Sequence, residues 1–354
     1  MEKEQSVSTN LFFFVGGLAL IFLSHTSLEN SYPSLTKGIE ALGFALVGYA
    51  PIRIIMTLGT WLRDNRTEAT INKLLKSTVR IVSLKGEMPI FIAVDVEGCL
   101  TPPQRSEISL RKFQKIRGYG EFVKSENGKN YPPLVIYTGR SQGYVELLAQ
   151  SLGLINDKFD LPFVIENGSA LYFPASKRTY PLITGEQRKI IFDVYELLSA
   201  DLPHNEFEPK SYMVSVNAVQ DSESIDELRE KIILILEEKN LLKDLTVSST
   251  ASAVDITLKD VNKLTGINEV IKIFHDLHPE KKEQGLTNLV VLADSTSDLP
   301  VIKKVGQAFC PAQESHPEVR SLIEKLFGSD HLINERQTDF VIAVIEKVCG
   351  LKLL

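Results

Sequence analysis

The sequence has few of the residues on which several common kinds of site depend. Only three of its 354 residues are cysteine, Cys99, Cys310 and Cys349, and none has the paired spacing of a structural metal site. Free thiols in a reducing compartment are the simplest interpretation. The net charge is −6, and no basic stripe with interleaved aromatic residues occurs beyond the N-terminal segment. Both features argue against nucleic acid as the main partner.

The remaining composition is that of a folded globular protein. Hydrophobic residues make up 44% of the chain and charged residues 24%, so nothing indicates a disordered protein. Roughly 260 residues follow the N-terminal segment, which is enough for a core domain and a smaller second domain. The sequence does not indicate an oligomeric state.

Two apolar stretches dominate residues 1–62. The first, about 8–28, contains no Asp, Glu, Lys or Arg, and the second, about 40–62, has Arg53 as its single charge after Glu40. Each is long enough to span a bilayer, so we predict a transmembrane helical hairpin. A signal-like segment and a buried helical pair are the alternatives. The acidic start lacks the positively charged region of a signal peptide.

Charge placement after the hairpin gives its expected orientation. Residues 63–85 contain six basic and two acidic side chains in a chain that is negative overall. By the positive-inside tendency, a multi-pass membrane protein is expected, with the domain that follows the hairpin in the cytoplasm. Apolar positions in 63–87 fall near helical spacing. This basic amphipathic linker is expected to lie on the anionic membrane face or to pack on the core as a solvated helix.

Strands alternate with helices over 88–170 and 260–330. Strands are predicted at 90–95, 133–138, 162–166, 288–293 and 306–310, and helices near 108–124, 141–152, 263–277, 297–304 and 315–327. This alternation predicts a doubly wound, Rossmann-like α/β core with a parallel sheet. A C-terminal helix in 331–354 is expected to pack on it.

The long insertion at 171–259 has a pattern of its own. Helices are predicted at 186–199 and 222–239, and strands at 211–217, 245–249 and 253–257. We interpret it as an α+β cap domain that closes over the site and selects the substrate. Lys210, at the start of the alternating strand, is either a substrate contact or a surface lysine.

Four junctions between a strand and a loop carry the chemistry. Asp95 and Glu97 follow the first strand in the turn Asp95-Val-Glu97-Gly98, and Thr138-Gly139-Arg140 follows the second. Lys263 begins a helix after the insertion, and Asp294 and Asp298 follow a Val/Leu strand. The carboxyl ends of parallel strands share one edge of a sheet, so these side chains are expected in one crevice.

In this order the junctions resemble the motifs of the haloacid dehalogenase superfamily, mostly magnesium-dependent phosphatases and phosphomutases with an Asp nucleophile. Phe163-Val-Ile-Glu166-Asn167-Gly168 resembles the turn of the subgroup with a large α/β cap, which includes Cof-type, sucrose and mannosyl-3-phosphoglycerate phosphatases. Of these, the sequence most resembles the mannosyl-3-phosphoglycerate phosphatases. The resemblance covers about residues 88–330.

The resemblance implies a role for each junction residue. Asp95 would be the nucleophile that forms an aspartyl-phosphate, and Glu97 the general acid/base. Mg²⁺ would be held by Asp95, Asp294 and the backbone carbonyl of Glu97, with Asp298 ordering a metal-bound water. Phosphate would contact Thr138, Gly139 and Lys263. Asn167 would orient the substrate or the Asp95 loop, and Arg140 would bind substrate or form a structural ion pair.

Glu97 departs from the family pattern, in which the second acid is usually Asp. The added methylene displaces the proton-transferring oxygen by on the order of an ångström, enough to cost about a hundredfold in rate. Acireductone-synthase-type members share the Glu, so it is compatible with catalysis. Cys99 and Ser297 also stand where Thr and Asn are usual. We interpret Cys99 as a buried thiol, with oxidation sensitivity as the alternative.

Three functional classes follow from these features. The first is a membrane-anchored phosphatase of a small sugar or glyceryl phosphate, with a mannosyl-3-phosphoglycerate-like substrate as the most specific hypothesis. The second is a phosphomutase that uses the same aspartyl-phosphate. The third is a membrane-tethered scaffold with little activity, which Glu97 favours more than an Asp would.

Overall fold

The computed structural model describes residues 79–83, 87–102, 108–156, 160–219, 222–250 and 253–354, all within one unit, Leu75–Leu354. Within these ranges no helix combines the length and the apolar character that a bilayer span requires. The predicted spans at 8–28 and 40–62, and most of the predicted linker, lie outside the described residues.

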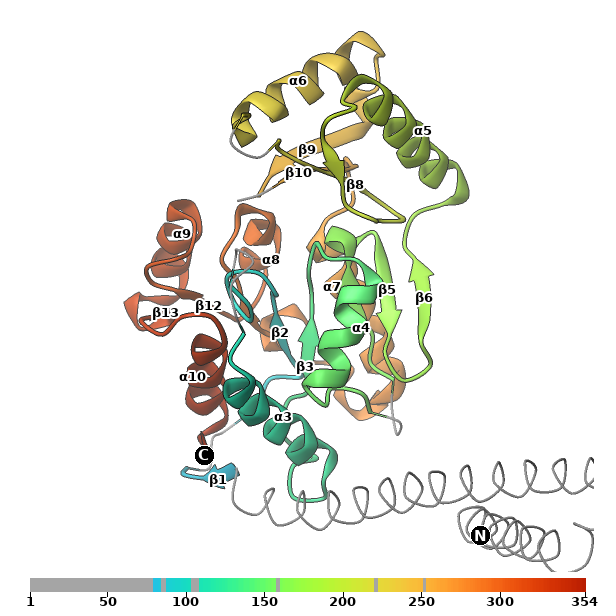
Figure 1. The fold of residues 1–354 in the computed structure, drawn as a ribbon. Coiled ribbons are helices and arrows are strands. Elements are labelled where there is room, and N and C mark those ends of the chain that lie inside the picture. Colours follow the sequence, from blue (N-terminus) through green and yellow to red (C-terminus); the bar gives the residue numbers. More distant parts are fainter. Residues whose placement is uncertain (1–78, 84–86, 103–107, 157–159, 220–221, 251–252) are drawn as a thin grey trace, which may run out of the picture. The chain divides into compact units, whose positions relative to one another are not determined.

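Five parallel strands form the central sheet, in the order β13-β12-β11-β2-β3 (Figure 1). Their bounds are Ile92–Val94 (β2), Leu134–Ile136 (β3), Val290–Leu292 (β11), Gln307–Pro311 (β12) and Leu332–Ile333 (β13). The residues of β2, β3 and β11 are all buried, as expected for a parallel sheet between helical layers. The order of strands reverses between β2 and β11. A ligand crevice is expected at their carboxyl ends.

The helices of the core overlap those predicted from the sequence. They are α3 (Leu110–Lys124), α4 (Gln142–Ser151), α7 (Lys263–Leu277), α8 (Leu299–Ile302) and α9 (Pro317–Phe327). A further helix, α10 (Gln337–Cys349), contacts α3 and β12 and buries Phe340, Val344 and Ile345. The start of α7 is fixed by Asn262, whose side chain accepts hydrogen bonds from the N–H groups of Leu264 and Thr265.

Two pairings differ from the expectation. The hairpin β5 (Ala170–Phe173) and β6 (Arg178–Pro181) pairs with β4 (Phe163–Ile165), although the insertion was predicted to begin at 171. Its residues join the core because Leu171 and Tyr172 are fully buried there. The helical spacing predicted for the linker is wrong over 79–81, where β1 (Val79–Ile81) pairs with β14 (Leu351–Leu353).

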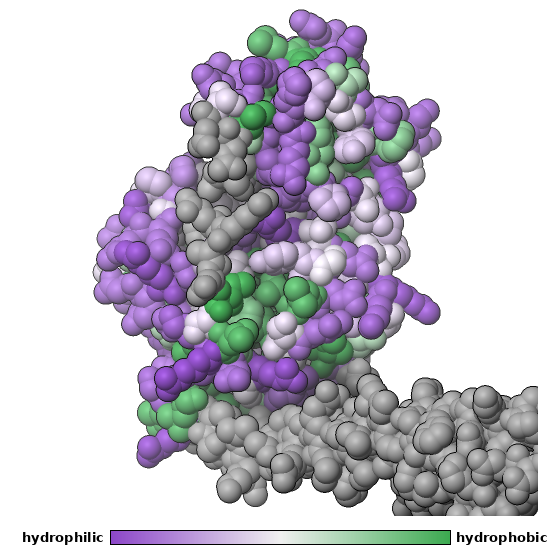
Figure 2. Space-filling view, in the orientation of Figure 1, coloured by the Kyte–Doolittle hydropathy of each residue, from purple (hydrophilic) through white to green (hydrophobic). Residues whose placement is uncertain are grey.

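The inserted domain has a separate sheet and a separate apolar cluster. Its antiparallel order is β7-β8-β10-β9, with bounds Glu206–Phe207 (β7), Val214–Asn217 (β8), Leu245–Ser249 (β9) and Ala253–Leu258 (β10). Helices α5 (Gly185–Asp201) and α6 (Ile225–Glu238) cover one face of this sheet (Figure 1). Hydrophilic side chains predominate on the side of cap and core shown in Figure 2. The face of the cap sheet that α5 and α6 do not cover is available to form part of the site.

Candidate active site

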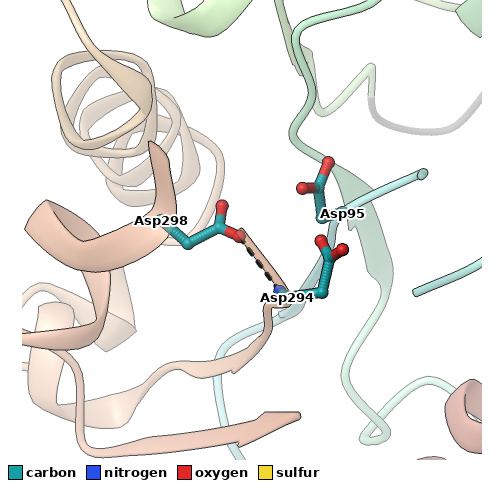
Figure 3. A group of neighbouring side chains, drawn as sticks. All are labelled: Asp95, Asp294 and Asp298. Carbon is teal, nitrogen blue, oxygen red and sulfur yellow. Dashed lines mark hydrogen bonds between the residues drawn. The ribbon is translucent and has the colours of Figure 1, made fainter. Parts of the chain in front are cut away.

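Three carboxylates meet at the switch point of the sheet. Asp95 follows β2, Asp294 follows β11, and Asp298 ends the 3₁₀ turn η6 (Thr296–Asp298) before α8. Each contributes an oxygen to a group whose members lie within 4.8 Å of one another (Figure 3). Asp95 and Asp298 are buried and Asp294 is partly exposed. Asp95, Asp294 and Asp298, which were expected to share one crevice, therefore lie together.

Lys263 joins two of these carboxylates. Its Nζ donates to Asp95 Oδ2 at 2.7 Å and to Asp298 Oδ1 at 2.8 Å, and its side chain is 2% exposed. The ammonium group also lies 4.9 Å from the centroid of the Tyr137 ring. Burial alone would lower the pKa of Lys263, but Asp298 and Asp95 together raise it well above its ordinary value. Lys263 is therefore a fixed positive charge beside Asp95.

The hydrogen bonds of the three carboxylates indicate which could bind a cation. Asp298 is committed: Oδ1 accepts from Lys263, and Oδ2 accepts the N–H groups of Asp294 and Ser295, each at 3.1 Å (Figure 3). Asp294 Oδ1 is buried, and among the described residues it has no hydrogen-bond partner. Asp95 lies beside it. A hard divalent cation held by Asp95 and Asp294, with Asp298 supporting it, fits this donor set.

Electrostatics favour the same conclusion. Asp95 and Asp298 share the ammonium group of Lys263, and burial raises the pKa of Asp95 to about 7 despite that partner. Burial, with repulsion from Asp95 and Asp298, also raises the pKa of Asp294 well above its ordinary value. A divalent cation would remove this excess of negative charge, and it would favour the ionised form of both carboxyls.

The turn after Asp95 requires a glycine. Gly98 has φ +74°, and a Cβ at this position would lie 2.0 Å from Asp294 Oδ2. Only glycine therefore allows the first loop to approach the carboxylate of the last one. The next residue, Cys99, is buried as predicted, and burial raises its thiol pKa well above the ordinary value. A protonated, inert thiol follows from this environment.

The loop after β3, which contains Thr138 and Gly139, also lines the crevice. Thr138 is buried, its Oγ1 accepts the Arg140 N–H at 3.2 Å, and its own N–H donates to Val164. Gly139 lines the pocket beside Asn167, whose Oδ1 would lie 3.0 Å from a Cβ at that glycine. Thr138, Gly139 and Lys263 thus border one space next to Asp95.

Arg140 forms ion pairs on both sides of the crevice. Its Nη2 donates to Glu97 Oε1, and its Nη1 donates to Glu208 Oε1 of the cap at 3.1 Å. Burial opposes the charged guanidinium, but Glu97 and Glu208 raise the pKa of Arg140. Of the two roles predicted for Arg140, the structure displays the ion pair.

Lys210 and Asn167 both contact a buried carboxylate of the cap. The Lys210 side chain is 4% exposed and lies 3.2 Å from Glu208 and 3.5 Å from Asp255. Its interpretation as a surface lysine is therefore wrong. Asn167 Nδ2 donates to Asp255 Oδ2 at 3.0 Å, so this side chain contacts the cap instead of the Asp95 loop.

The cap residues of the site and the role of Glu166 were not predicted from the sequence. Glu208, Asp255 and Ser215 line the pocket, and Ser215 Oγ donates to Asp255 Oδ1 at 2.6 Å. An Asp within the apolar strand Ala253-Val-Asp-Ile-Thr-Leu258 was a signal from which Asp255 could have been found. The Glu166 carboxylate accepts the N–H groups of Ser211 and Tyr212, and so joins the core to the cap.

No protein-family model and no curated protein sequence matches this chain. Solved structures do match: a haloacid dehalogenase-like hydrolase from Bacteroides thetaiotaomicron superposes with a TM-score of 0.51 at 16% identity, over 73% of this chain and 98% of its own. The chain has the haloacid dehalogenase-like fold.

Two further structures are similar to this chain. A protein of Thermoplasma acidophilum gives a TM-score of 0.51 at 14% identity, with 74% of this chain and 98% of that one covered. The sucrose-phosphatase of Synechocystis, in complex with sucrose and phosphate, gives 0.48 at 13% identity, with the same coverage.

Proposed function

We propose that this chain is a Mg²⁺-dependent phosphatase of a small phosphorylated metabolite, a sugar or glyceryl phosphate. The observation that carries the proposal is the group of Asp95, Lys263, Asp294 and Asp298 at the switch point of the haloacid dehalogenase-like fold, in which all but Asp294 are buried. It combines a nucleophile, a fixed positive charge and a carboxylate oxygen that has no hydrogen-bond partner among the described residues and could bind a metal ion. Phosphoryl transfer requires such a nucleophile and such neutralising charge.

In the first step a carboxylate oxygen of Asp95 attacks phosphorus, and the bond from phosphorus to the leaving oxygen breaks. Glu97 gives its proton to that oxygen, so the alcohol departs and an aspartyl-phosphate remains. In the second step Glu97 takes a proton from water as the water oxygen attacks phosphorus. The bond to Asp95 breaks, and inorganic phosphate is released.

The other residues bind and screen the phosphoryl group. Thr138, the N–H groups around Gly139, and Lys263 border the space beside Asp95 and supply donors to the phosphate oxygens. Lys263 also reduces the repulsion between Asp95 and an incoming dianion. Mg²⁺, held by Asp95, Asp294 and the carbonyl of Glu97, would neutralise charge on the phosphoryl oxygens.

The lining of the cap favours a leaving group rich in hydroxyls. All but one of its lining residues are polar or charged; they are Glu208, Lys210, Ser215, Ser248, Ser249, Thr250, Ala253 and Asp255. Ser249 Oγ is buried, and it has no hydrogen-bond partner among the described residues. Such a lining suits a polyol better than an aromatic or lipid group. A mannosyl-3-phosphoglycerate-like compound is the specific candidate from sequence resemblance.

The proposal also includes a membrane anchor at 1–62 that leaves the catalytic domain in the cytoplasm. The apolar stretches and the basic residues of 63–85 support it. The protein should pellet with membranes and resist carbonate extraction. Release of the full chain by carbonate would remove this part of the proposal without affecting the phosphatase.

Phosphate release from a panel of sugar and glyceryl phosphates with Mg²⁺ tests the activity. Asp95→Asn should lower turnover at least about 10³-fold, because the covalent route is lost. An isomeric phosphate with little free phosphate would indicate a phosphomutase instead. No Asp95-dependent turnover on any member of the panel would favour a tethered scaffold.

A further inference from the structure

One guanidinium joins the second acid of the site to the cap. Arg140, in the loop between β3 and α4, donates to Glu97 through Nη2 and to Glu208 through Nη1. Glu97 belongs to the core and Glu208 to the segment between β7 and β8. The three side chains are partly buried, with 26%, 35% and 19% of their surface exposed for Arg140, Glu97 and Glu208. The Glu97 carboxylate is thus linked to the cap through one side chain.

Glu208 is fixed to the sheet of the cap. Its Oε2 lies 3.2 Å from Lys210 Nζ, and that ammonium lies 3.5 Å from Asp255 Oδ1 on β10. Asp255 is 4% exposed and accepts the Ser215 hydroxyl of β8 at 2.6 Å. These contacts tie Glu208 to two strands of the cap. A movement of the cap sheet would therefore carry Glu208 with it.

Arg140 also holds Glu97, the carboxylate on the core side of the site. A planar guanidinium presents its donors in a fixed fork, so two carboxylates bound to it are held at set positions. Glu97 has one more rotatable bond than the Asp usual at its position, and so has more conformational freedom to lose. A displacement of about one ångström in a reacting group can cost about a hundredfold in rate. Glu97 therefore needs an orienting partner more than an Asp would.

We propose that Arg140 is a positioning residue that couples the orientation of Glu97 to closure of the cap through Glu208. The guanidinium holds Glu97 in place for proton transfer while Glu208 holds the guanidinium. When the cap moves away, Arg140 loses one of its two carboxylate partners, and Glu97 loses its fixed orientation. Proton transfer is then confined to the closed enzyme. This inference rests on the proposed phosphatase activity and assigns the acid/base step to the closed state.

A double-mutant cycle between Glu97 and Glu208 tests the coupling. In the full chain, with Mg²⁺ and the best substrate of the panel, Glu208→Gln should lower kcat about tenfold and change KM less than about threefold. In the Glu97→Gln background the same substitution should lower kcat less than about twofold, because the group that it positions is already gone. Arg140→Lys keeps the positive charge but lacks the forked guanidinium. It should lower kcat to the same extent as Glu208→Gln in each of the two backgrounds.

Glu206→Gln is the matched control. It makes the same substitution at an exposed position of β7, two residues before Glu208, and should leave kcat and KM unchanged. Near-ultraviolet circular dichroism should show that each variant is folded.

An equal loss of kcat in both backgrounds would overturn the coupling, as would a loss confined to KM, which would make Glu208 a substrate-binding residue. Turnover that does not depend on Asp95 would instead remove the proposed function itself.

Discussion

The protein freed of divalent cations should lose stability as the pH rises through neutrality. Burial raises the pKa of Asp95 from its ordinary value of 3.8 to about 7; Lys263 opposes this effect and Asp298 adds to it. Between these two values the folded state keeps a proton that the unfolded chain has released. The contribution of Asp95 is therefore fully present below pH 3.8 and is lost as the pH rises through 7.

The magnitude follows from the linkage between protonation and folding. Over this window one such group changes the free energy of unfolding by about 1.36 kcal/mol per pH unit. From about pH 5.5 to pH 7 the metal-free protein should lose on the order of 2 kcal/mol through Asp95. Mg²⁺ should reverse the loss, because a cation at a hundred times its Kd stabilises the folded state by about 2.7 kcal/mol.

Denaturant unfolding of the full chain in mild detergent provides the assay. Tyr119, Tyr137 and Tyr172 are fully buried in the core, so tyrosine near-ultraviolet circular dichroism reports its unfolding. With EDTA the stability should fall over this pH range, and the fall should be smaller in Asp95→Asn, which loses the contribution of Asp95 and keeps that of Asp294. A metal-free stability that stays constant or rises over the range, in both proteins alike, would refute the electrostatic argument.

Three further substitutions have defined outcomes. Gly98→Ala should displace Asp294 and lower Mg²⁺-dependent phosphate release about a hundredfold, whereas Gly143→Ala, which meets no atom within 4 Å, should leave it unchanged. Lys263→Met should lower the free energy of unfolding by about 3–5 kcal/mol, because it leaves two buried carboxylates unpaired, and Mg²⁺ should recover part of this loss. Glu166→Gln should cost about 1–3 kcal/mol and hasten proteolysis of the cap, because one amide oxygen cannot accept both the Ser211 and the Tyr212 N–H groups as well as a carboxylate does.

Much of the core could be predicted because its signals are local. The apolar runs of β2, β3 and β11 are continuous and end in polar residues, and parallel strands place those residues at one edge. That geometry alone predicted that Asp95 and Asp294 would meet. The helix of Lys263 was also predictable, since Asn262 caps its first turn.

The residues that were missed depend on pairings between distant segments. β1 pairs with β14, at the far end of the chain, and no local pattern specifies such a partner. Glu208 and Asp255 reach the site only because the cap packs over the core, so their role follows from tertiary structure. The same packing buries Lys210, which its position in the sequence suggested was on the surface.

In the proposed reaction Asp95 carries the phosphoryl group between two chemical steps. The most direct measurement is rapid acid quench of the enzyme during turnover of the best sugar phosphate, followed by mass spectrometry of the peptide that contains Asp95. We predict a phosphoryl adduct on Asp95 that forms only with Mg²⁺ and accumulates further in Glu97→Gln, since loss of the base slows its hydrolysis. Substrate turnover by a folded enzyme with no such adduct, or with the adduct on another residue, would contradict the account.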